Sequence, residues 1–305
     1  IIAVNGWNVP KAPADGSSVP GEWNEKVKWT GVANNKRVYL LNLDKAGLTG
    51  TLDVSGLTAL TYLYCGNNQL TGLNVSGLSA LIVLYCNGNQ LTGLNVGGLT
   101  ALHDLRCHYN QLTELNVSGL TALQVLYCYD NQLTGLNVSG LSNLQQLYCH
   151  HNYMADRSAV TGREIDWDNT NFKFDPQHVL LSFTAEQTGG ANGTADSTGI
   201  KLTFDKDVTG LTADKITLTN GTGEASKGNL TGSGQTWDLA LAQVTKPGDI
   251  YVSIANFGDY RVTNNPQPVR VHKAGAPTYT VTVTGGTANG RSAVSVAKDA
   301  VISLT

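Results

Sequence analysis

Leucines recur with a period of 21 residues through the first half of the chain. Between residues 60 and 153 the pattern L-x-x-L-x-C-x-x-N-x-L returns in every period, and the five cysteines, at positions 65, 86, 107, 128 and 149, mark its phase. Apolar positions separated by one variable position are typical of a short strand with one buried face. The fixed period predicts a solenoid, in which each unit adds one strand to a stacked parallel sheet. In the third unit the side chains expected to point inward are Leu102, Leu105, Cys107, Asn110, Leu112, Leu115, Val117 and Leu120.

This repeat is the leucine-rich repeat pattern, with cysteine in place of its third leucine. Residues 38–48 read VYLLNLDKAGL and form a first, imperfect unit, so the predicted array spans 38–153. Tryptophan and proline gather in residues 1–37, and aromatic residues gather in 154–177. We interpret these two segments as the N-terminal and C-terminal caps of the array.

From residue 178 the hydrophobic period changes to two. Alternating strands are expected at 200–204, 215–219, 237–244, 250–254 and 269–273. Short strands separated by glycine, asparagine and aspartate predict an immunoglobulin-like β-sandwich over 178–274. Residues 275–305 are interpreted as part of a further small β module. The predicted fold class is therefore mainly β.

The inward asparagine of each unit is expected to pair backbone groups that the bend leaves without partners. The cysteines invite a redox or metal-binding interpretation, but parallel strands lie about 4.8 Å apart and their in-register side chains do not converge. A disulfide needs Cβ atoms about 3.5–4.5 Å apart. We therefore expect five reduced, buried thiols that act as small apolar side chains.

The variable positions flank the inward leucines and are expected to line the exposed, concave side of the sheet. One column contains Tyr64, Tyr85, Arg106, Tyr127 and Tyr148; the next contains Gly66, Asn87, His108, Tyr129 and His150; the third contains Asn67, Gly88, Tyr109, Asp130 and His151. A contiguous exposed aromatic patch usually marks an interaction site, and tyrosine and arginine are enriched in binding hot spots. The predicted partner-binding residues are Tyr64, Tyr85, Asp104, Arg106, His108, Tyr127, Tyr129, Asp130, Tyr148 and His150. The alternative is that tyrosine stacking across the strands only stabilises the sheet.

The charged residues of the repeat array indicate which classes of partner to expect. Between residues 48 and 153 there is no lysine, and Arg106 is the single cation, flanked in its column by Tyr85 and Tyr127, on which it is expected to stack;. Such a surface has no basic footprint for phosphates, so nucleic acid is not an expected partner. Histidines in the patch are expected to make binding change between about pH 5 and 8.

Other chemistry finds little support in the residues. His108, His150 and His151 with Asp130 are candidate metal ligands, but an open sheet holds ligands apart, and we expect neither a metal nor a cofactor;. The chain contains no nucleophile elbow, HExxH motif or phosphate loop, which argues against an enzyme.

No run of 18 apolar residues is present, so no membrane-spanning segment is expected;. The start without methionine and the end in mid-pattern suggest a processed or trimmed piece of a longer protein.

The chain resembles bacterial cell-surface leucine-rich repeat proteins. The resemblance rests on the repeat LTGLNVSGLTALxxLYCxxNQ, on NFKFDPQ at the end of the second cap, and on the later segments STGIKLTFDKDVTGLTADKITLTNGTG and YTVTVTGGTANG. The arrangement is similar to that of internalins, which join a repeat array to an immunoglobulin-like domain, although internalin repeats are usually one residue longer. The resemblance implies a protein that is secreted or attached to the cell surface.

The function expected from the sequence is that of a non-enzymatic, monomeric binding protein, an adhesin or ligand-capture module, whose concave face binds a protein. Carbohydrate binding is an alternative, because tyrosine rings stack on sugars. A structural spacer in a cell-envelope protein is a second alternative. A third is a targeting part of an enzyme whose catalytic domain lies beyond residue 305.

Overall fold

A computed structural model describes residues 26–30, 37–168, 170–275, 278–282 and 293–297. The chain divides into two compact units, Ile1–Val179 and Leu180–Thr305. Most of the cap predicted at 1–37 and most of the module predicted at 275–305 lie outside the described residues. Within that module the structure describes one antiparallel pair, β21 (Thr278–Thr282) and β22 (Ala293–Ala297).

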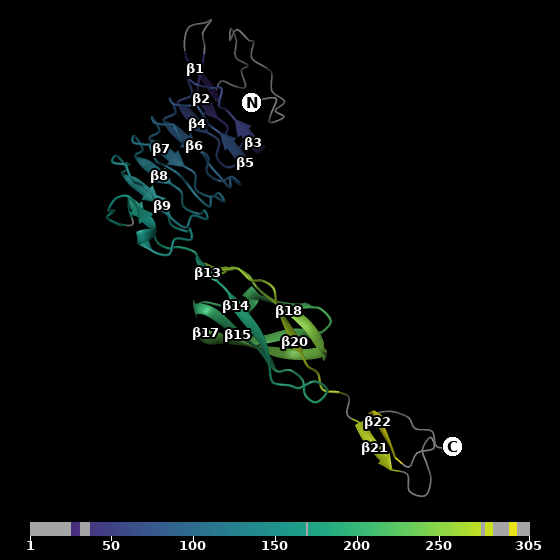
Figure 1. Ribbon diagram of the computed structural model, residues 1–305. Helices are drawn as coiled ribbons and strands as arrows, with labels where there is room; N and C mark the ends of the chain where they lie inside the picture. Colours follow the sequence, from purple (N-terminus) through teal and green to yellow (C-terminus); the bar gives the residue numbers. More distant parts are fainter. Residues whose placement is uncertain (1–25, 31–36, 169, 276–277, 283–292, 298–305) are drawn as a thin grey trace. The chain divides into compact units, whose positions relative to one another are not determined.

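The first unit is built on an eight-stranded sheet (Figure 1). β1 (Val27–Thr30) is antiparallel to β2 (Arg37–Asn42), and each later strand is parallel to the one before it. The later strands are β4 (Tyr62–Tyr64), β6 (Val83–Tyr85), β7 (Asp104–Arg106), β8 (Val125–Tyr127), β10 (Gln146–Tyr148) and β12 (Phe172–Lys173). From β4 to β10 the register advances by one 21-residue repeat per strand, so equivalent positions lie side by side. The predicted solenoid, with one short strand per repeat, is confirmed.

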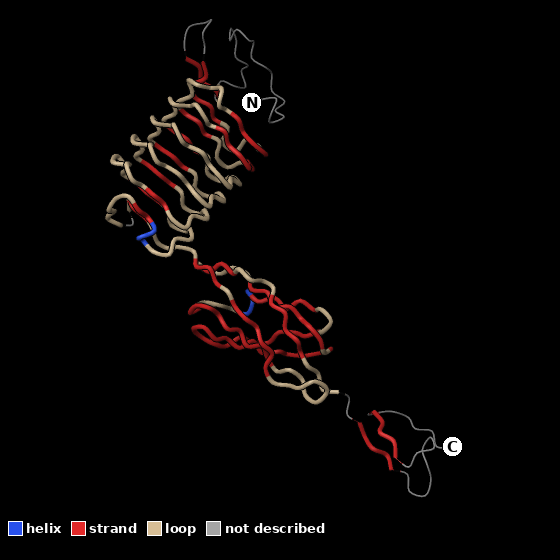
Figure 2. The backbone as a smooth tube through the Cα atoms, viewed as in Figure 1, coloured by secondary structure: helices blue, strands red, loops and turns tan. Residues whose placement is uncertain are grey.

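The opposite side of the solenoid is mostly turns (Figure 2). Two short parallel pairs lie there, β3 (Thr49–Asp53) with β5 (Gln69–Asn74) and β9 (Leu136–Asn137) with β11 (Val160–Thr161). The described helices are two 3-10 turns, η2 (Arg157–Ala159) and η3 (Ala213–Lys215). Within the described ranges no helix is long and apolar enough to cross a membrane.

The core of the first unit is a stack of leucine and cysteine side chains. In the third repeat Leu102, Leu105, Cys107 and Leu112 are each 0% exposed, as the repeat pattern predicts. All five cysteines are free and buried, and burial raises the pKa of the Cys86 thiol to about 12. The inward phase predicted for the cysteines is therefore confirmed.

One asparagine in each turn pairs the backbone of two turns. Asn131 is 4% exposed, and its Nδ2 donates to the carbonyl oxygens of Cys107 and Cys128 at 3.1 Å. Its Oδ1 accepts a hydrogen bond from the N–H of Leu112 at 3.0 Å. The same contacts recur at Asn68, Asn89, Asn110 and Asn152. The asparagine ladder expected from the sequence is present.

Residues 154–177 cover the last turn of the solenoid. Phe174 is buried in the same core. Gln177 extends the asparagine ladder, because its Oε1 accepts a hydrogen bond from the Asn152 N–H at 3.1 Å and its Nε2 donates to the Cys149 carbonyl oxygen at 3.0 Å. Gln177 thus pairs the N–H of Asn152 and the carbonyl oxygen of Cys149, two backbone groups of the last turn.

The second unit contains two three-stranded antiparallel sheets that share one core. One sheet consists of β14 (Phe183–Thr188), β15 (Gly199–Val208) and β17 (Glu224–Lys246), and the other of β16 (Ile216–Asn220), β18 (Gly248–Ile254) and β20 (Gln267–Val271). A separate pair joins β13 (Val179–Leu181) to β19 (Tyr260–Val262). The five strands expected from the alternating pattern are present, whereas the immunoglobulin-like topology stays a prediction.

Strand β17 differs from the expectation of a strand at 237–244 alone. The first part of β17 lies beside its last part in space. A Cβ on Gly228 would lie 3.3 Å from the carbonyl oxygen of Ala240. Gly232 and Gly234, with φ of +144° and +59°, stand where the segment reverses. These backbone angles favour glycine, which explains a reversal that the hydrophobic period does not reveal.

We predict that Asn131→Ala lowers the free energy of unfolding by about 1–3 kcal/mol, because buried backbone groups lose their hydrogen-bond partners. The neighbouring exposed Gln132→Ala is the matched control and should change it by less than about 0.5 kcal/mol;. Urea denaturation of both variants measures the difference. Equal effects would contradict the role of the ladder.

We also predict that none of the five thiols reacts with a thiol reagent in the native protein, because all are buried and their thiolate forms are disfavoured;. All five should react after denaturation. Titration with a chromogenic disulfide at neutral pH, with and without guanidinium, counts them. A native disulfide or a fast-reacting native thiol would show this assignment to be wrong.

Candidate functional site

The candidate site is the exposed face of the eight-stranded sheet. In each three-residue strand from β4 to β10 the middle residue is buried and its two neighbours are partly exposed. The register therefore brings the first predicted column together across neighbouring strands. We call the following set the aromatic stripe: Tyr64, Tyr85, Arg106, Tyr127, Tyr148, His108, Tyr129 and His150.

Arg106 lies at the centre of this stripe. Its guanidinium carbon is 4.4 Å from the ring centroid of Tyr85 and 4.9 Å from that of Tyr127, which confirms the expected stacking. Its Nε and Nη2 also donate to the carboxylate of Asp104 at 3.2 and 3.1 Å. The Tyr85 hydroxyl donates to the same carboxylate at 2.7 Å, and burial with this hydrogen bond raises the pKa of Tyr85 to about 12. The expected stacking of Arg106 is thus combined with an ion pair to Asp104 that the repeat pattern does not reveal.

Stacking continues through the second half of the stripe. The rings of Tyr127 and Tyr148 stack with centroids 4.4 Å apart, and Tyr129 lies between His108 at 4.4 Å and His150 at 4.6 Å. Both faces of the Tyr129 ring are therefore covered by neighbours of the stripe. This half of the stripe presents mainly ring edges and polar atoms to a partner.

His150 corrects one expectation. The sequence predicts an exposed partner-binding residue at this position, yet only 6% of the His150 surface is exposed. The Tyr129 ring covers one side of it, and His151 packs edge-on at 4.9 Å. Tyr109, which the sequence analysis left out of the partner-binding set, is by contrast 55% exposed and packs edge-on against Tyr129.

The third column varies for a reason that the sequence analysis missed. Its residues adopt left-handed backbone angles, with φ between +51° and +65° at Asn67, Gly88, Tyr109, Asp130 and His151. Glycine, asparagine and aspartate tolerate this conformation, whereas bulky side chains adopt it at a cost. The signal in the sequence is the set Asn, Gly and Asp at equivalent positions, against which tyrosine and histidine stand out.

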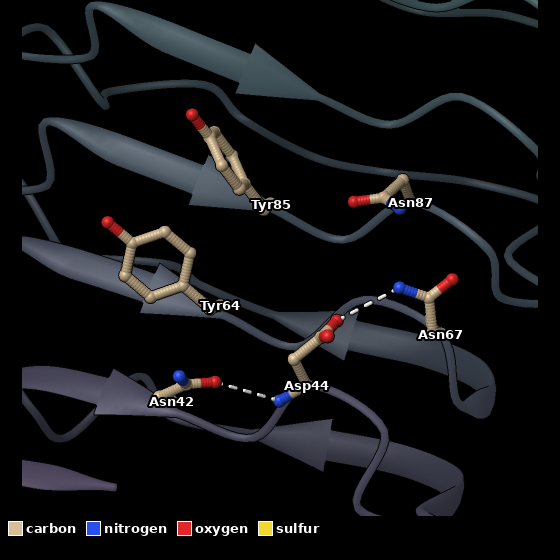
Figure 3. A pocket seen from close by; sticks show the side chains of 6 residues that line it. All are labelled: Asn42, Asp44, Tyr64, Asn67, Tyr85 and Asn87. Atoms are coloured by element: carbon tan, nitrogen blue, oxygen red, sulfur yellow. Dashed lines mark hydrogen bonds between the residues drawn. The ribbon is translucent and has the colours of Figure 1, made fainter. Parts of the chain in front are cut away.

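A polar hollow lies at the other end of the stripe (Figure 3). It is lined by Asn42, Asp44, Tyr64, Asn67, Tyr85 and Asn87. Asp44 accepts a hydrogen bond from Asn67 Nδ2 at 3.1 Å. The absence of a side chain at Gly66 makes room for the hollow. A Cβ at this position would lie 2.9 Å from the side-chain oxygens of both Asn87 and Asp44. The hollow does not follow from the repeat pattern, although a glycine in a column of larger residues is its signature.

Two histidines of the stripe are neutral at physiological pH. Burial and the charge of Arg106 lower the pKa of His108 to about 4, although Asp130 acts in the opposite direction. Burial, followed by the charge of Lys173, lowers the pKa of His150 to about 4 as well. The expectation that these imidazoles change charge between pH 5 and 8 is therefore wrong for both.

Three of the four residues considered as metal ligands come together. The ligand atoms of Asp130, His150 and His151 all lie within 4.8 Å of one another. His108 is not part of this group and lies against the opposite face of Tyr129. The sequence predicts that the open sheet keeps all four ligands apart. This is true of His108, whereas Asp130, His150 and His151 lie together.

Comparison with known proteins supports the repeat interpretation. The model of the Leucine Rich Repeat family matches residues 59–81 and 122–144. These two segments are leucine-rich repeats. No curated protein matches the chain.

Among solved structures, the functional domain of InlJ from Listeria monocytogenes, described as including a cysteine ladder, is similar to this chain at 32% identity with a TM-score of 0.37. The match covers 46% of this chain and 35% of that one. The internalin-like arrangement with an immunoglobulin-like module stays a prediction.

We predict an imidazole pKa near 4 for His108, measured by NMR titration of its ring protons and assigned with His108→Gln. The unfolded chain takes up this proton near pH 6.5. The stabilising contribution of the neutral imidazole is thus complete above pH 6.5 and is lost as the pH falls toward 4;. In thermal melts the wild type should lose stability over this range more steeply than His108→Gln. A midpoint near 6.5 in the folded protein would contradict the burial of this ring.

Proposed function

We propose that the aromatic stripe is the binding surface for a protein partner. The observation that carries the proposal is the Asp104–Arg106 pair on β7, between two strands that both read Val-Leu-Tyr. A third Val-Leu-Tyr strand would continue the tyrosine column. A partly buried ion pair adds desolvation cost that packing of the sheet does not require.

A protein fits this surface better than a sugar. Carbohydrate recognition by tyrosine uses an open ring face, and both faces of Tyr129 are covered within the stripe. The Arg106 guanidinium is likewise held between two rings. What remains for a partner is a row of ring edges and hydroxyls around one ion pair, with the exposed ring of Tyr109 beside it and the Tyr64 ring, which meets Tyr85 edge-on, at the end of the column. Such mixed aromatic and polar surfaces are typical of protein hot spots.

The size of the stripe suits the centre of a protein interface. Five adjacent strands at about 4.8 Å spacing extend roughly 19 Å along the stack. A standard interface buries about 800 Å² on each partner, of which a few central residues supply most of the affinity. The stripe would then be the centre, and the polar hollow beside Tyr64 would belong to the rim.

The setting we propose is extracellular and non-enzymatic, that of an adhesin or ligand-capture module. It is supported by the resemblance of the repeats to those of bacterial surface proteins and by the binding roles typical of leucine-rich repeats;. The stripe contains tyrosines, histidines and Arg106, which pairs with Asp104 beside it, and it has no nucleophile paired to a base;. Under the rival spacer function, the stripe would only stabilise the stack.

We predict that the double variant Asp104→Val with Arg106→Tyr, which makes β7 identical to β6 and β8, keeps or raises thermal stability but weakens partner binding by about 30-fold or more;. A partner is first selected from a library of displayed extracellular proteins, in parallel with a glycan array. Tyr127→Ala should weaken the same binding, and Ser118→Ala in an exposed turn is the control.

Each outcome decides between the functions. Unchanged affinity in the double variant would show that the stripe only packs. Binding to glycans alone would favour the carbohydrate alternative, and no partner in either screen would favour the spacer.

A further inference from the structure

We propose that Asp130, His150 and His151 form a binding site for one divalent transition-metal ion of the zinc class. The three residues come from two successive repeats, directly after β8 and β10. Two imidazoles and one carboxylate are a ligand set that suits Zn²⁺. The proposal rests on the geometry of these side chains and does not depend on the proposed protein-binding function.

The spacing of two ligand atoms already fits one ion. His151 Nδ1 and Asp130 Oδ2 are 3.4 Å apart, longer than a strong charge-assisted hydrogen bond;. Two donor atoms each about 2.1 Å from a tetrahedral zinc ion are about 3.4 Å apart. The third ligand atom, from His150, lies within 4.8 Å of the other two, so a small side-chain movement closes the set.

His150 supplies a second, independent observation. The residue is 94% buried, since 6% of its surface is exposed, and its Nδ1 is buried without a hydrogen-bond partner in the structure. Buried polar atoms are rarely left unpaired, and those that are call for an explanation such as an ion. A metal bound at this nitrogen would satisfy it, whereas Nδ1 of His108, likewise buried and unpaired, lies outside the group of ligands. The stacked Tyr129 ring holds the imidazole in place.

The backbone also holds the other two ligands in position. Asp130 and His151 both adopt φ of +51°, the left-handed conformation that each turn has at this point. Histidine adopts this conformation less readily than glycine, and residues kept in such conformations gather at functional sites. The His151 ring stacks on His178 with centroids 5.4 Å apart, which fixes its orientation.

The equivalent positions of the other repeats show that the set occurs once among the described turns. Where Asp130 and His151 stand, earlier turns have Asn67, Gly88 and Tyr109. Three protein ligands also leave a fourth coordination position for water or for a group from outside. The arrangement therefore resembles an open site more than a closed structural one.

The test uses the full chain without a polyhistidine tag, stripped of metal with a chelator and titrated with Zn²⁺ by calorimetry. We expect one saturable Zn²⁺ site for each chain, a rise in melting temperature on binding, and no comparable binding of Mg²⁺. Co²⁺ in place of Zn²⁺ should give the visible absorption of a tetrahedral or five-coordinate site.

The variants are chosen to keep the fold. Asp130→Asn and His151→Asn both place asparagine at a left-handed position, where Asn67 already stands in an earlier turn. Each should weaken Zn²⁺ binding by at least tenfold, while His108→Gln, a histidine of the stripe outside the set, should leave it unchanged. Circular dichroism and melting of the metal-free variants confirm that they fold.

Three results would overturn the proposal. They are the absence of a saturable site at one ion per chain, equal affinity in the two asparagine variants and the wild type, and equal loss in His108→Gln. In each case the His151–Asp130 contact would be a hydrogen-bonded pair only.

Discussion

The first unit depends on one inward side-chain amide in each turn, which is buried at Asn89, Asn131 and Asn152. A solenoid bends its backbone after every strand, and there the carbonyl oxygens of the cysteines accept hydrogen bonds from side-chain amides. Asn131 donates to two of these oxygens and accepts from the N–H of Leu112 in the turn before. Because each asparagine bonds to its own turn and to the previous one, it also sets the register between them. A one-residue slip would break these bonds in every turn at once.

That register decides what the exposed face can be. Residues 21 positions apart are brought to neighbouring strands, so a repeat that keeps tyrosine at one position builds a column of rings. Ring centroids 4.4–4.6 Å apart in the stacked pairs are close to the spacing of the strands themselves, about 4.8 Å;. Stacked rings leave mainly their edges for contact with other molecules, whereas Tyr64 meets Tyr85 edge-on, with 81° between the ring planes.

The parts of the structure that follow from periodicity were predictable from the sequence. The buried leucines, the thiols and the asparagine ladder each repeat five times or nearly so, and one hydrophobic period determines them all. The parts that depend on a single repeat were not. The pairing of Asp104 with Arg106, the burial of His150 beneath its neighbours and the meeting of Asp130 with His151 depend on side-chain directions, which a pattern of apolar positions does not contain. The left-handed third column was visible as Asn67, Gly88 and Asp130, but its meaning requires the backbone angles.

The departures from the repeat are therefore the most informative positions on this face. A repeat copied without change would give five equivalent strands and a uniform column of tyrosines, which is sufficient for packing. The third repeat replaces Val and Tyr with Asp104 and Arg106, and the last turns place an acid and two histidines where earlier turns have smaller or uncharged residues. Both departures put groups that carry charge or bind metals onto a face that otherwise stacks neutral rings, and neither adds an apolar contact to the core. Since the solenoid frame is the same beneath every repeat, it holds each exception at a defined distance from the next. The proposed binding surface and the proposed metal site thus both lie where the repeat is broken, while the stabilising core lies where it is kept.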